Sequence, residues 1–358
     1  MFLTRLALQH FRSYSEAIFP FTDKATIIIG PNAAGKSNVI ESLVLLTTGK
    51  SFRSEKEGQL VQFGQDICRI TGELHDGDSD ETKLEIVLSH LPGSTGRKKY
   101  LVNGIPRRRV DFVGRMPSVL FTPEDLDLVT GQPGNRRRFL DDTLSQTDDQ
   151  YHVAHTTYTK ALRQRNALLE QVQQTGIRNE KIFTYWDELL ITNGSLLTAK
   201  RQALIDQINA RLKELFSFTL SYDASIISEE RLARYKAGEV GAGVTLVGPH
   251  RDDVLISGIH PVSKEPVDLK YFASRGQQRL VTLELKLAQI AFVEEQTKMQ
   301  PLLLLDDIFS ELDSGHIAHV LQFIHTHQTI ITTTHREFVE NVNGNVIELE
   351  NNPKSNEY

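Results

Sequence analysis

The chain contains the stretch Gly30-Pro31-Asn32-Ala33-Ala34-Gly35-Lys36-Ser37, which matches the pattern G-x-x-x-x-G-K-[ST]. An apolar β-type run, Thr26 to Ile29, leads into it, and a helical pattern from Asn38 to Leu46 follows. A chance glycine-rich turn with an exposed lysine is the alternative, but it does not explain this strand-loop-helix context. The sequence therefore predicts a phosphate-binding loop.

The residue types of this loop suit a nucleoside triphosphate with Mg²⁺. Glycines allow a tight turn whose N–H groups surround phosphate oxygens, and the positive end of the next helix faces the same anions. Lys36 is expected to reach the β- and γ-phosphates, and Ser37 to offer its hydroxyl to Mg²⁺, which prefers oxygen ligands. The nucleotide-binding residues expected here are Gly30, Pro31, Asn32, Ala33, Ala34, Gly35, Lys36, Ser37 and Asn38.

A pair of acids ends a second apolar run late in the chain, Leu302 to Asp307. Four leucines in a row are typical of a buried parallel strand, and ligands in α/β sheets collect at the carboxyl ends of such strands. We expect Asp306 to lie beside Mg²⁺ and Asp307 to act as the general base toward the attacking water. An isolated Asp-Asp pair could equally cap a helix.

A third segment, Ser274 to Arg279, precedes a long amphipathic pattern through Ala291. Ser274 can cap that helix, and a hydroxyl, a glycine N–H and a helix N-terminus together can bind an anion. Taken alone, such a segment is more often an ordinary N-cap.

The order of these segments, followed by Ser310 to Asp313 and then by Thr332 to His335, resembles the ATP-binding cassette (ABC) family. The resemblance implies an α/β fold, an ABC-type ATPase head with mixed and antiparallel sheets, plus a second, mainly helical lobe. It further implies that Ser274, Gly276 and Gln277 bind the γ-phosphate of a partner subunit and that Ser310 to Asp313 is the D-loop. In the same way, His335 is expected to be a catalytic switch histidine beside Lys36 and Asp307.

Within that family the chain is similar to the SMC-like class, and specifically to the RecF family, because Lys36 and Ser274 are separated by helices too short for a long coiled coil. The segments that carry this likeness are His10 to Tyr14, Lys50 to Arg53, Pro123 to Leu126, Arg136 to Asp141, Gly248 to Asp253 and Asp306 to Asp313. The resemblance implies a weak, DNA-stimulated ATPase of DNA repair, replication and the SOS response, in which hydrolysis is a conformational switch. It implies an ATP-dependent homodimer on duplex or gapped DNA, with RecR, RecO and RecA as partners. It also places Arg12 near the nucleotide, although a lone arginine could equally be a surface charge. The chain departs from the family in having no clear Q-loop glutamine, and Glu124, at the end of the segment Phe121 to Glu124, is the candidate substitute.

Domain organisation follows from a change of pattern along the chain. Strand-like runs fill the first part, and leucines at helical spacing extend from Leu189 to Leu215. Ala237 to Gly243 is expected to be a flexible return to the first lobe. We expect lobe I at 1–115 and 245–358 and the helical lobe II at 116–244, with the helix from Ser274 packing on lobe II.

Composition narrows the cellular context. The 358 residues include a single cysteine, Cys68, and the N-terminal stretch lacks the apolar core of a secretory signal. No run of about 20 apolar residues suggests a membrane span. We therefore expect a soluble, cytoplasmic protein, and the resemblance implies that it associates with the nucleoid.

Because the net charge is −6, any attraction to DNA must come from local basic clusters. Each such cluster is more often just a solvated surface, and the third may pair with Glu124, Asp125, Asp141 or Asp142. The candidates for phosphate contacts are Arg97, Lys98, Lys99, Arg107, Arg108, Arg109, Arg136, Arg137 and Arg138, with a preference for the 97 to 109 hairpin.

Two other functions stay open at this point. A transport ATPase is disfavoured by the long spacing between Lys36 and Ser274. A scaffold that keeps nucleotide only as a structural ligand is disfavoured by the presence of both Lys36 and the Asp306-Asp307 pair, although the sequence does not report turnover.

Overall fold

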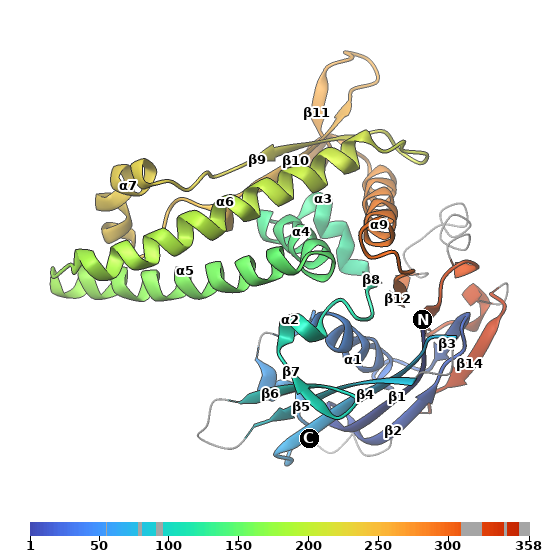
Figure 1. Ribbon diagram of the computed structural model, residues 1–358. Helices are drawn as coiled ribbons and strands as arrows, with labels where there is room; N and C mark the ends of the chain where they lie inside the picture. Colours follow the sequence, from blue (N-terminus) through green and yellow to red (C-terminus); the bar gives the residue numbers. More distant parts are fainter. Residues whose placement is uncertain (55, 78–80, 91–95, 309–323, 340–341, 351–358) are drawn as a thin grey trace. The chain divides into compact units, whose positions relative to one another are not determined.

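The computed structural model describes residues 1–54, 56–77, 81–90, 96–308, 324–339 and 342–350 (Figure 1). Two compact units share the chain. Unit 1 comprises Met1–Asp125 and Gln289–Tyr358, and unit 2 comprises Leu126–Ala288.

An antiparallel sheet forms one layer of unit 1, with strand order β2-β1-β4-β5-β6-β7. Its inner face is apolar, as Leu8, Ile70 and Ile86 lie opposite one another across three strands and are buried. Asn103 and Gly104 form the turn between β6 and β7, and both have positive φ, 52° and 77°, as an Asn-Gly hairpin turn requires. The strands are β1 (Phe2–Phe11), β2 (Tyr14–Pro20), β4 (Ile67–His75), β5 (Glu81–Ser89), β6 (Arg97–Val102) and β7 (Ile105–Arg107).

A parallel sheet forms a second layer of unit 1, with strand order β14-β3-β13-β12-β8. Because all its strands run the same way, their carboxyl ends share one edge. Helix α1 (Lys36–Thr48) packs against strands of both sheets, so it lies in the core between them (Figure 1). The strands are β3 (Ala25–Ile29), β8 (Ser118–Phe121), β12 (Leu302–Asp306), β13 (Thr329–Thr333) and β14 (Gly344–Glu348).

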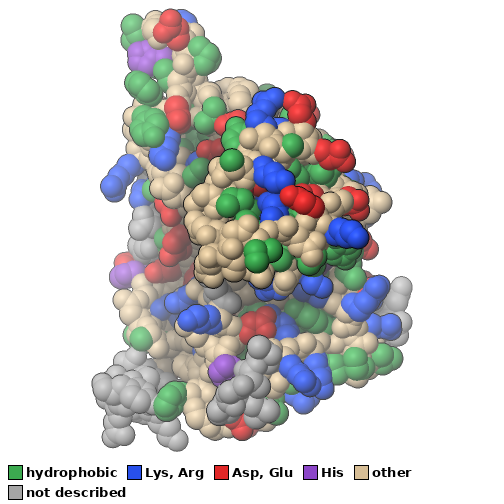
Figure 2. Space-filling view, turned by 90° about the vertical axis from the view of Figure 1, so that its left-hand side faces the viewer, with side chains coloured by type: hydrophobic (Ala, Val, Ile, Leu, Met, Phe, Trp, Pro, Cys, Tyr) green, Lys and Arg blue, Asp and Glu red, His purple; other side chains and the backbone are tan. Residues whose placement is uncertain are grey.

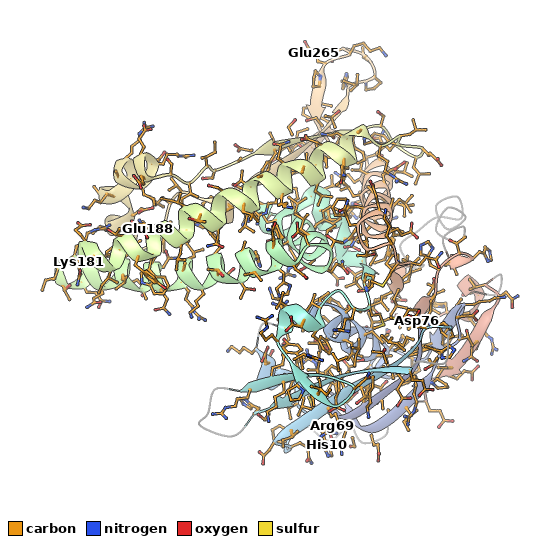
Figure 3. All side chains as sticks on the ribbon, viewed as in Figure 1. His10, Arg69, Asp76, Lys181, Glu188 and Glu265 are labelled. Atoms are coloured by element: carbon orange, nitrogen blue, oxygen red, sulfur yellow. The ribbon has the colours of Figure 1, made fainter. Side chains whose placement is uncertain are left out.

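Unit 2 is mainly helical. Helices α5 (Asp149–Thr175) and α6 (Glu180–Ala210) form its long antiparallel hairpin, and Lys181 and Glu188 mark the early turns of α6 in Figure 3. A small antiparallel sheet completes the unit, with order β11-β10-β9. The remaining elements are α3 (Asp127–Thr130), α4 (Pro133–Thr147), β9 (Thr219–Asp223), α7 (Glu229–Ala242), the 3-10 helix η3 (Pro249–Arg251), β10 (Asp253–Ile259), β11 (Pro266–Asp268), α8 (Leu269–Phe272) and α9 (Arg275–Thr297), whose last turns belong to unit 1.

Two expectations about local structure in unit 2 are wrong. The stretch Ala237 to Gly243 is not a flexible return, because α7 continues through it to Ala242. A tertiary ion pair holds this helix: the buried carboxylate of Glu239 lies 2.7 Å from Arg165. The leucine pattern also overruns its helix, since α6 ends at Ala210 and Leu212 is exposed.

The unit boundaries differ from the expected lobes. Residues 245–288 belong to unit 2, together with the helices, and residues 116–125 belong to unit 1. The reason is the small sheet: β10 packs against α4, and β9 packs against α6. No helix in the described part of the chain is long and apolar enough to cross a bilayer.

Candidate nucleotide site and its surroundings

The loop between β3 and α1 has a conformation that only glycine fits at its last position. Gly35 has φ 99°, and a Cβ there would lie 2.6 Å from the hydroxyl oxygen of Tyr14. Ala33 also has positive φ, 67°. Burial raises the pKa of Tyr14 to about 12, so this phenol stays protonated beneath the loop.

Lys36, the first residue of α1, folds across the loop that precedes it. Its Nζ donates to the carbonyl oxygens of Gly30 at 2.7 Å and Pro31 at 3.0 Å. Burial lowers the pKa of Lys36, while the negative charges of Asp307 and Asp306 oppose that shift. The ammonium group of Lys36 thus lies at the carboxyl edge of the parallel sheet, where the phosphates are expected to bind.

Asp306 ends β12 beside the phosphate-binding loop. Its Oδ1 accepts hydrogen bonds from Ser37 Oγ at 3.1 Å and from Thr332 Oγ1 at 2.6 Å. Burial raises the pKa of Asp306, and the two hydroxyl hydrogen bonds act in the opposite direction. Thr332 was not predicted as a site residue, although its place in the segment before His335 puts it on the neighbouring strand.

The donors at this edge fit Mg²⁺. A hydroxyl and a carboxylate are oxygen ligands, and octahedral Mg²⁺ with bonds of about 2.1 Å keeps adjacent ligands about 3 Å apart. Ser37 Oγ and Asp306 Oδ1 are 3.1 Å apart. Among the described residues no group of three or more His, Cys, Asp or Glu side chains could hold a metal by itself. A metal here would therefore complete its ligand set with phosphate oxygens and water.

Asp307 and His335 follow neighbouring strands at the same edge. Asp307 has φ 52°, uncommon for a residue other than glycine, and its N–H donates to the carbonyl and hydroxyl oxygens of Thr332. His335 follows β13; its N–H donates to Thr333 Oγ1, and its ring is half-exposed with Nδ1 3.5 Å from Glu337. Glu124 is exposed shortly after β8, the strand on the other side of β12.

A network of charged residues lies beside α1. Arg12 makes a bidentate ion pair with the fully buried Glu41, at 2.8 and 2.7 Å, and also donates to the carbonyl oxygen of Gln59. Ser51 donates to the same carboxylate at 2.5 Å. The positive charge of Arg53, two residues later, counteracts the rise in the pKa of Asp306. Sequence reasoning missed Glu41 and gave Arg53 no role.

Ser274, Gly276 and Gln277 lie in unit 2, at the exposed N-terminus of α9. Ser274 Oγ accepts from the Gln277 N–H at 3.3 Å, while Gln277 Oε1 accepts from the Ser274 N–H at 2.9 Å. This reciprocal capping box fixes the helix start and leaves its first turn open to solvent. The expected D-loop, Ser310 to Asp313, lies outside the described residues.

Some arginines and lysines of the basic clusters are engaged inside the protein, and others are exposed. Arg136 is buried in a bidentate ion pair with Asp253, at 2.7 and 3.0 Å, and Arg137 donates to the carbonyl oxygen of Asp252. These contacts count against the expected role of both residues in DNA binding, although Arg137 stays partly exposed. The partners are not the acids named above, because the fold brings β10 against α4. Arg138 is exposed.

In the 97 to 109 hairpin, Lys98 and Arg109 also point inward. Lys98 contacts Glu57 and donates to the carbonyl oxygen of Gly49, and Arg109 donates to the carbonyl oxygen of Thr48. Both side chains are thus engaged inside unit 1, which counts against their expected role as DNA contacts. Arg108 pairs with Asp111 at the surface, and the exposed cations that remain are Arg97, Lys99 and Arg107.

Other charges surround these cations. Arg69, labelled in Figure 3, lies in the same cross-strand row of the antiparallel sheet as Lys99, but it pairs with Glu85 at 3.1 Å. On the face shown in Figure 2, Lys and Arg side chains are interspersed with acidic ones. Any affinity for DNA thus depends on a few local cations.

Comparison with known proteins gives consistent results. The RecF/RecN/SMC N terminal domain family matches residues 2–355. A DNA replication and repair protein RecF from Thermomicrobium roseum is 37% identical over 95% of both chains. Another from Shouchella clausii is 35% identical over 93% of both chains.

Solved structures agree with the sequence relatives. Two structures of the recombination mediator protein RecF in the RecFOR pathway, described as RecF-ATPrS and RecF-ATP, each have a TM-score of 0.84 and cover 97% of this chain and 95% of theirs, at 28% and 27% identity. An Smc head domain from Pyrococcus furiosus shares the fold at 18% identity, with a TM-score of 0.52 and coverage of 97% and 93%. The predicted ABC-type ATPase fold is thereby confirmed, and the chain belongs to the RecF/RecN/SMC N-terminal domain family, in its RecF branch of DNA replication and repair proteins.

Proposed function

We propose that this protein binds and slowly hydrolyses Mg-ATP between two copies of itself and that the ATP-bound dimer holds duplex or gapped DNA. With RecO and RecR it helps RecA load at single-strand gaps, in the cytoplasm and close to the nucleoid. Support for the pathway comes from its RecF relatives and from the RecFOR pathway named for the similar structures.

One observation carries the ATPase proposal: Lys36, Ser37 and Asp306 converge at one sheet edge. Ser37 and Asp306 would hold Mg²⁺, which neutralises phosphate charge when bound, and Lys36 exchanges its loop carbonyls for phosphate oxygens. Asp307 orients and deprotonates the attacking water, and His335 contacts the γ-phosphate or that water. Because phosphoryl transfer needs little covalent work from the protein, positioning and charge supply most of the rate.

The second copy would supply Ser274, Gly276 and Gln277 in trans. The capping box places the Ser274 hydroxyl at the start of a 23-residue helix, whose positive end suits an anion. Closure of the dimer then controls hydrolysis, and hydrolysis reopens it. DNA contacts would come from Arg97, Lys99 and Arg107, which bind phosphates with little sequence preference and stimulate the ATPase.

The test is mass in solution by light scattering, for the wild type and Asp307→Asn, with and without Mg-ATP and duplex DNA. The mass should double with Mg-ATP. The dimer should persist longer in Asp307→Asn, and it should retain DNA in a salt-sensitive way. Ser274→Arg is the matched variant: it should bind ATP and remain a monomer. If mass never changes while ATP binds, the two-copy mechanism is wrong and a nucleotide-dependent scaffold replaces it.

A further inference from the structure

Strand β6 has two faces with different partners. Arg97 and Lys99 are exposed, and neither forms an ion pair with any residue that the structure describes. Lys98 and Tyr100 alternate with them and point to the core side, opposite Leu88 and Ile86 of β5. One strand thus joins the proposed DNA cations to the interior of unit 1.

The inward side chains converge on the carboxyl end of α1. Lys98 Nζ and the Tyr100 hydroxyl donate to the Gly49 carbonyl at 3.0 and 3.2 Å, and Arg109 donates to the Thr48 carbonyl at 2.7 Å. Gly49 has φ 71°, and a Cβ there would lie only 2.8 Å from Arg109 Nε. The contact between hairpin and helix is therefore close and specific, and its donors face the negative end of the helix dipole.

The opposite end of α1 is the phosphate-binding loop. The helix begins at Lys36, directly after Gly35, and every residue from Val39 to Thr47 is buried between the two sheets. A helix packed on all sides moves as a rigid body. A displacement of its carboxyl end by β6 would therefore also displace Lys36 and Ser37.

A second chain of contacts runs from Lys98 toward the charged network beside α1. Lys98 forms an ion pair with Glu57, and two residues later the Gln59 carbonyl accepts from Arg12. Arg12 in turn holds the buried Glu41 of α1. Lys98 is thus common to both routes from the hairpin to the nucleotide site.

We infer that Lys98, with Tyr100 and Arg109, forms a joint that couples DNA contact on the outer face of β6 to the position of the phosphate-binding loop. These are positioning residues for ATP hydrolysis: they do not contact DNA or nucleotide. The inference rests on the proposed function, since it presumes that DNA stimulates the ATPase.

The experiment compares Lys98→Met with Lys99→Met in the full chain. Both substitutions remove one positive charge from adjacent residues of one strand, but only Lys98 contacts α1. DNA affinity is measured by anisotropy of a labelled duplex, and ATP turnover is measured without DNA and at saturating DNA. Tyr100→Phe, which removes only the hydroxyl, provides a second variant if Lys98→Met fails to fold.

Lys98→Met is expected to have a DNA affinity within about 2-fold of that of the wild type. Its DNA-dependent increase in ATP turnover should be at least about 5-fold smaller than the increase in the wild type. Lys99→Met should bind DNA more weakly but reach the wild-type rate at saturation. Tyr100→Phe should lose part of the increase. Full stimulation in both Lys98→Met and Tyr100→Phe overturns the joint.

The proposed function can fail separately. If Arg97→Met and Lys99→Met both bind DNA like the wild type, the proposed DNA surface is wrong, and the joint is rejected with it. If DNA leaves wild-type turnover unchanged, DNA stimulation is rejected, and so is a joint that would transmit it. If the Arg97 and Lys99 variants lose DNA affinity while DNA stimulates the Lys98 and Tyr100 variants as fully as the wild type, the DNA surface stands and the joint alone is rejected.

Discussion

Asp306 shows how a functional charge acts against folding at the scale of one residue. Its carboxylate is 8% exposed, and burial raises its pKa despite hydrogen bonds from Ser37 and Thr332. Because folding raises this pKa, the folded protein binds the proton more tightly than the unfolded chain does. Its stabilising contribution is present at low pH and is lost as pH rises through the folded pKa, so the ionised group destabilises the nucleotide-free protein at neutral pH.

Asp306→Asn should therefore stabilise the nucleotide-free protein at pH 7, by on the order of 1 kcal/mol. The amide keeps an acceptor for both hydroxyls and removes the buried charge. The same variant should lose the thermal stabilisation that Mg-ATP gives the wild type, because the metal loses its carboxylate. Thermal unfolding with and without Mg-ATP measures both effects, and a variant less stable than the wild type at pH 7 would contradict the argument.

At the scale of elements, the segment Gly248 to Asp253 organises unit 2. Asp252 accepts hydrogen bonds from Arg201, at 2.9 Å, and from Tyr222, while Asp253 pairs with Arg136 of α4. His250 Nδ1 lies 2.8 Å from the Tyr158 hydroxyl of α5. A short polar segment thus ties helices from distant parts of the sequence to β10.

His250 also makes unit 2 sensitive to acid. Burial lowers its pKa from 6.5 to about 4, so the ring is neutral in the folded protein, whereas the unfolded chain protonates it below about pH 6.5. The stability that depends on the neutral ring is lost as pH falls from 6.5 to 4.

We expect the free energy of unfolding of unit 2 to fall across that range by on the order of 2 kcal/mol more in the wild type than in His250→Gln. Trp186, the only tryptophan, lies in α6 and reports this unit. Urea unfolding followed by its fluorescence at several pH values measures the difference. Parallel pH profiles for the two proteins would exclude His250 as the source.

At the scale of the whole molecule, the proposed site is divided between copies. Lys36 belongs to unit 1 and Ser274 to unit 2, and a two-fold dimer would contain two equivalent sites, each built from both chains. Two variants, each inactive by itself, can then complement each other.

Lys36→Ala and Ser274→Arg should each abolish ATP turnover, and an equal mixture should recover turnover, up to about half of the wild-type rate. Neither variant forms an ATP-bound dimer by itself, so the dimers in the mixture are mixed, and each mixed dimer has one site with both defects and one with none. Steady-state ATPase assays of the mixture against each variant alone measure this. A mixture as inactive as its components would argue that each chain completes its own site.

Features that depend on local backbone conformation and on the order of segments could be predicted from the sequence. The phosphate-binding loop was predictable because a strand, a glycine turn and the start of a helix lie within a few residues of one another. The strand that ends at Asp306 was predictable because four consecutive leucines indicate a buried strand. The order of these segments was enough to identify the ABC-type fold, which the similar structures confirm.

Which charged side chains are engaged inside the protein could not be predicted from the sequence. The sequence suggests that Lys98, Arg109, Arg136 and Arg137 are surface cations, yet backbone carbonyls and acids far away in sequence engage them. The unit boundary and the helical state of Ala237 to Gly243 likewise depend on distant contacts. A charged side chain is exposed or paired according to the residues that folding places beside it, and the order of residues along the chain does not specify those neighbours.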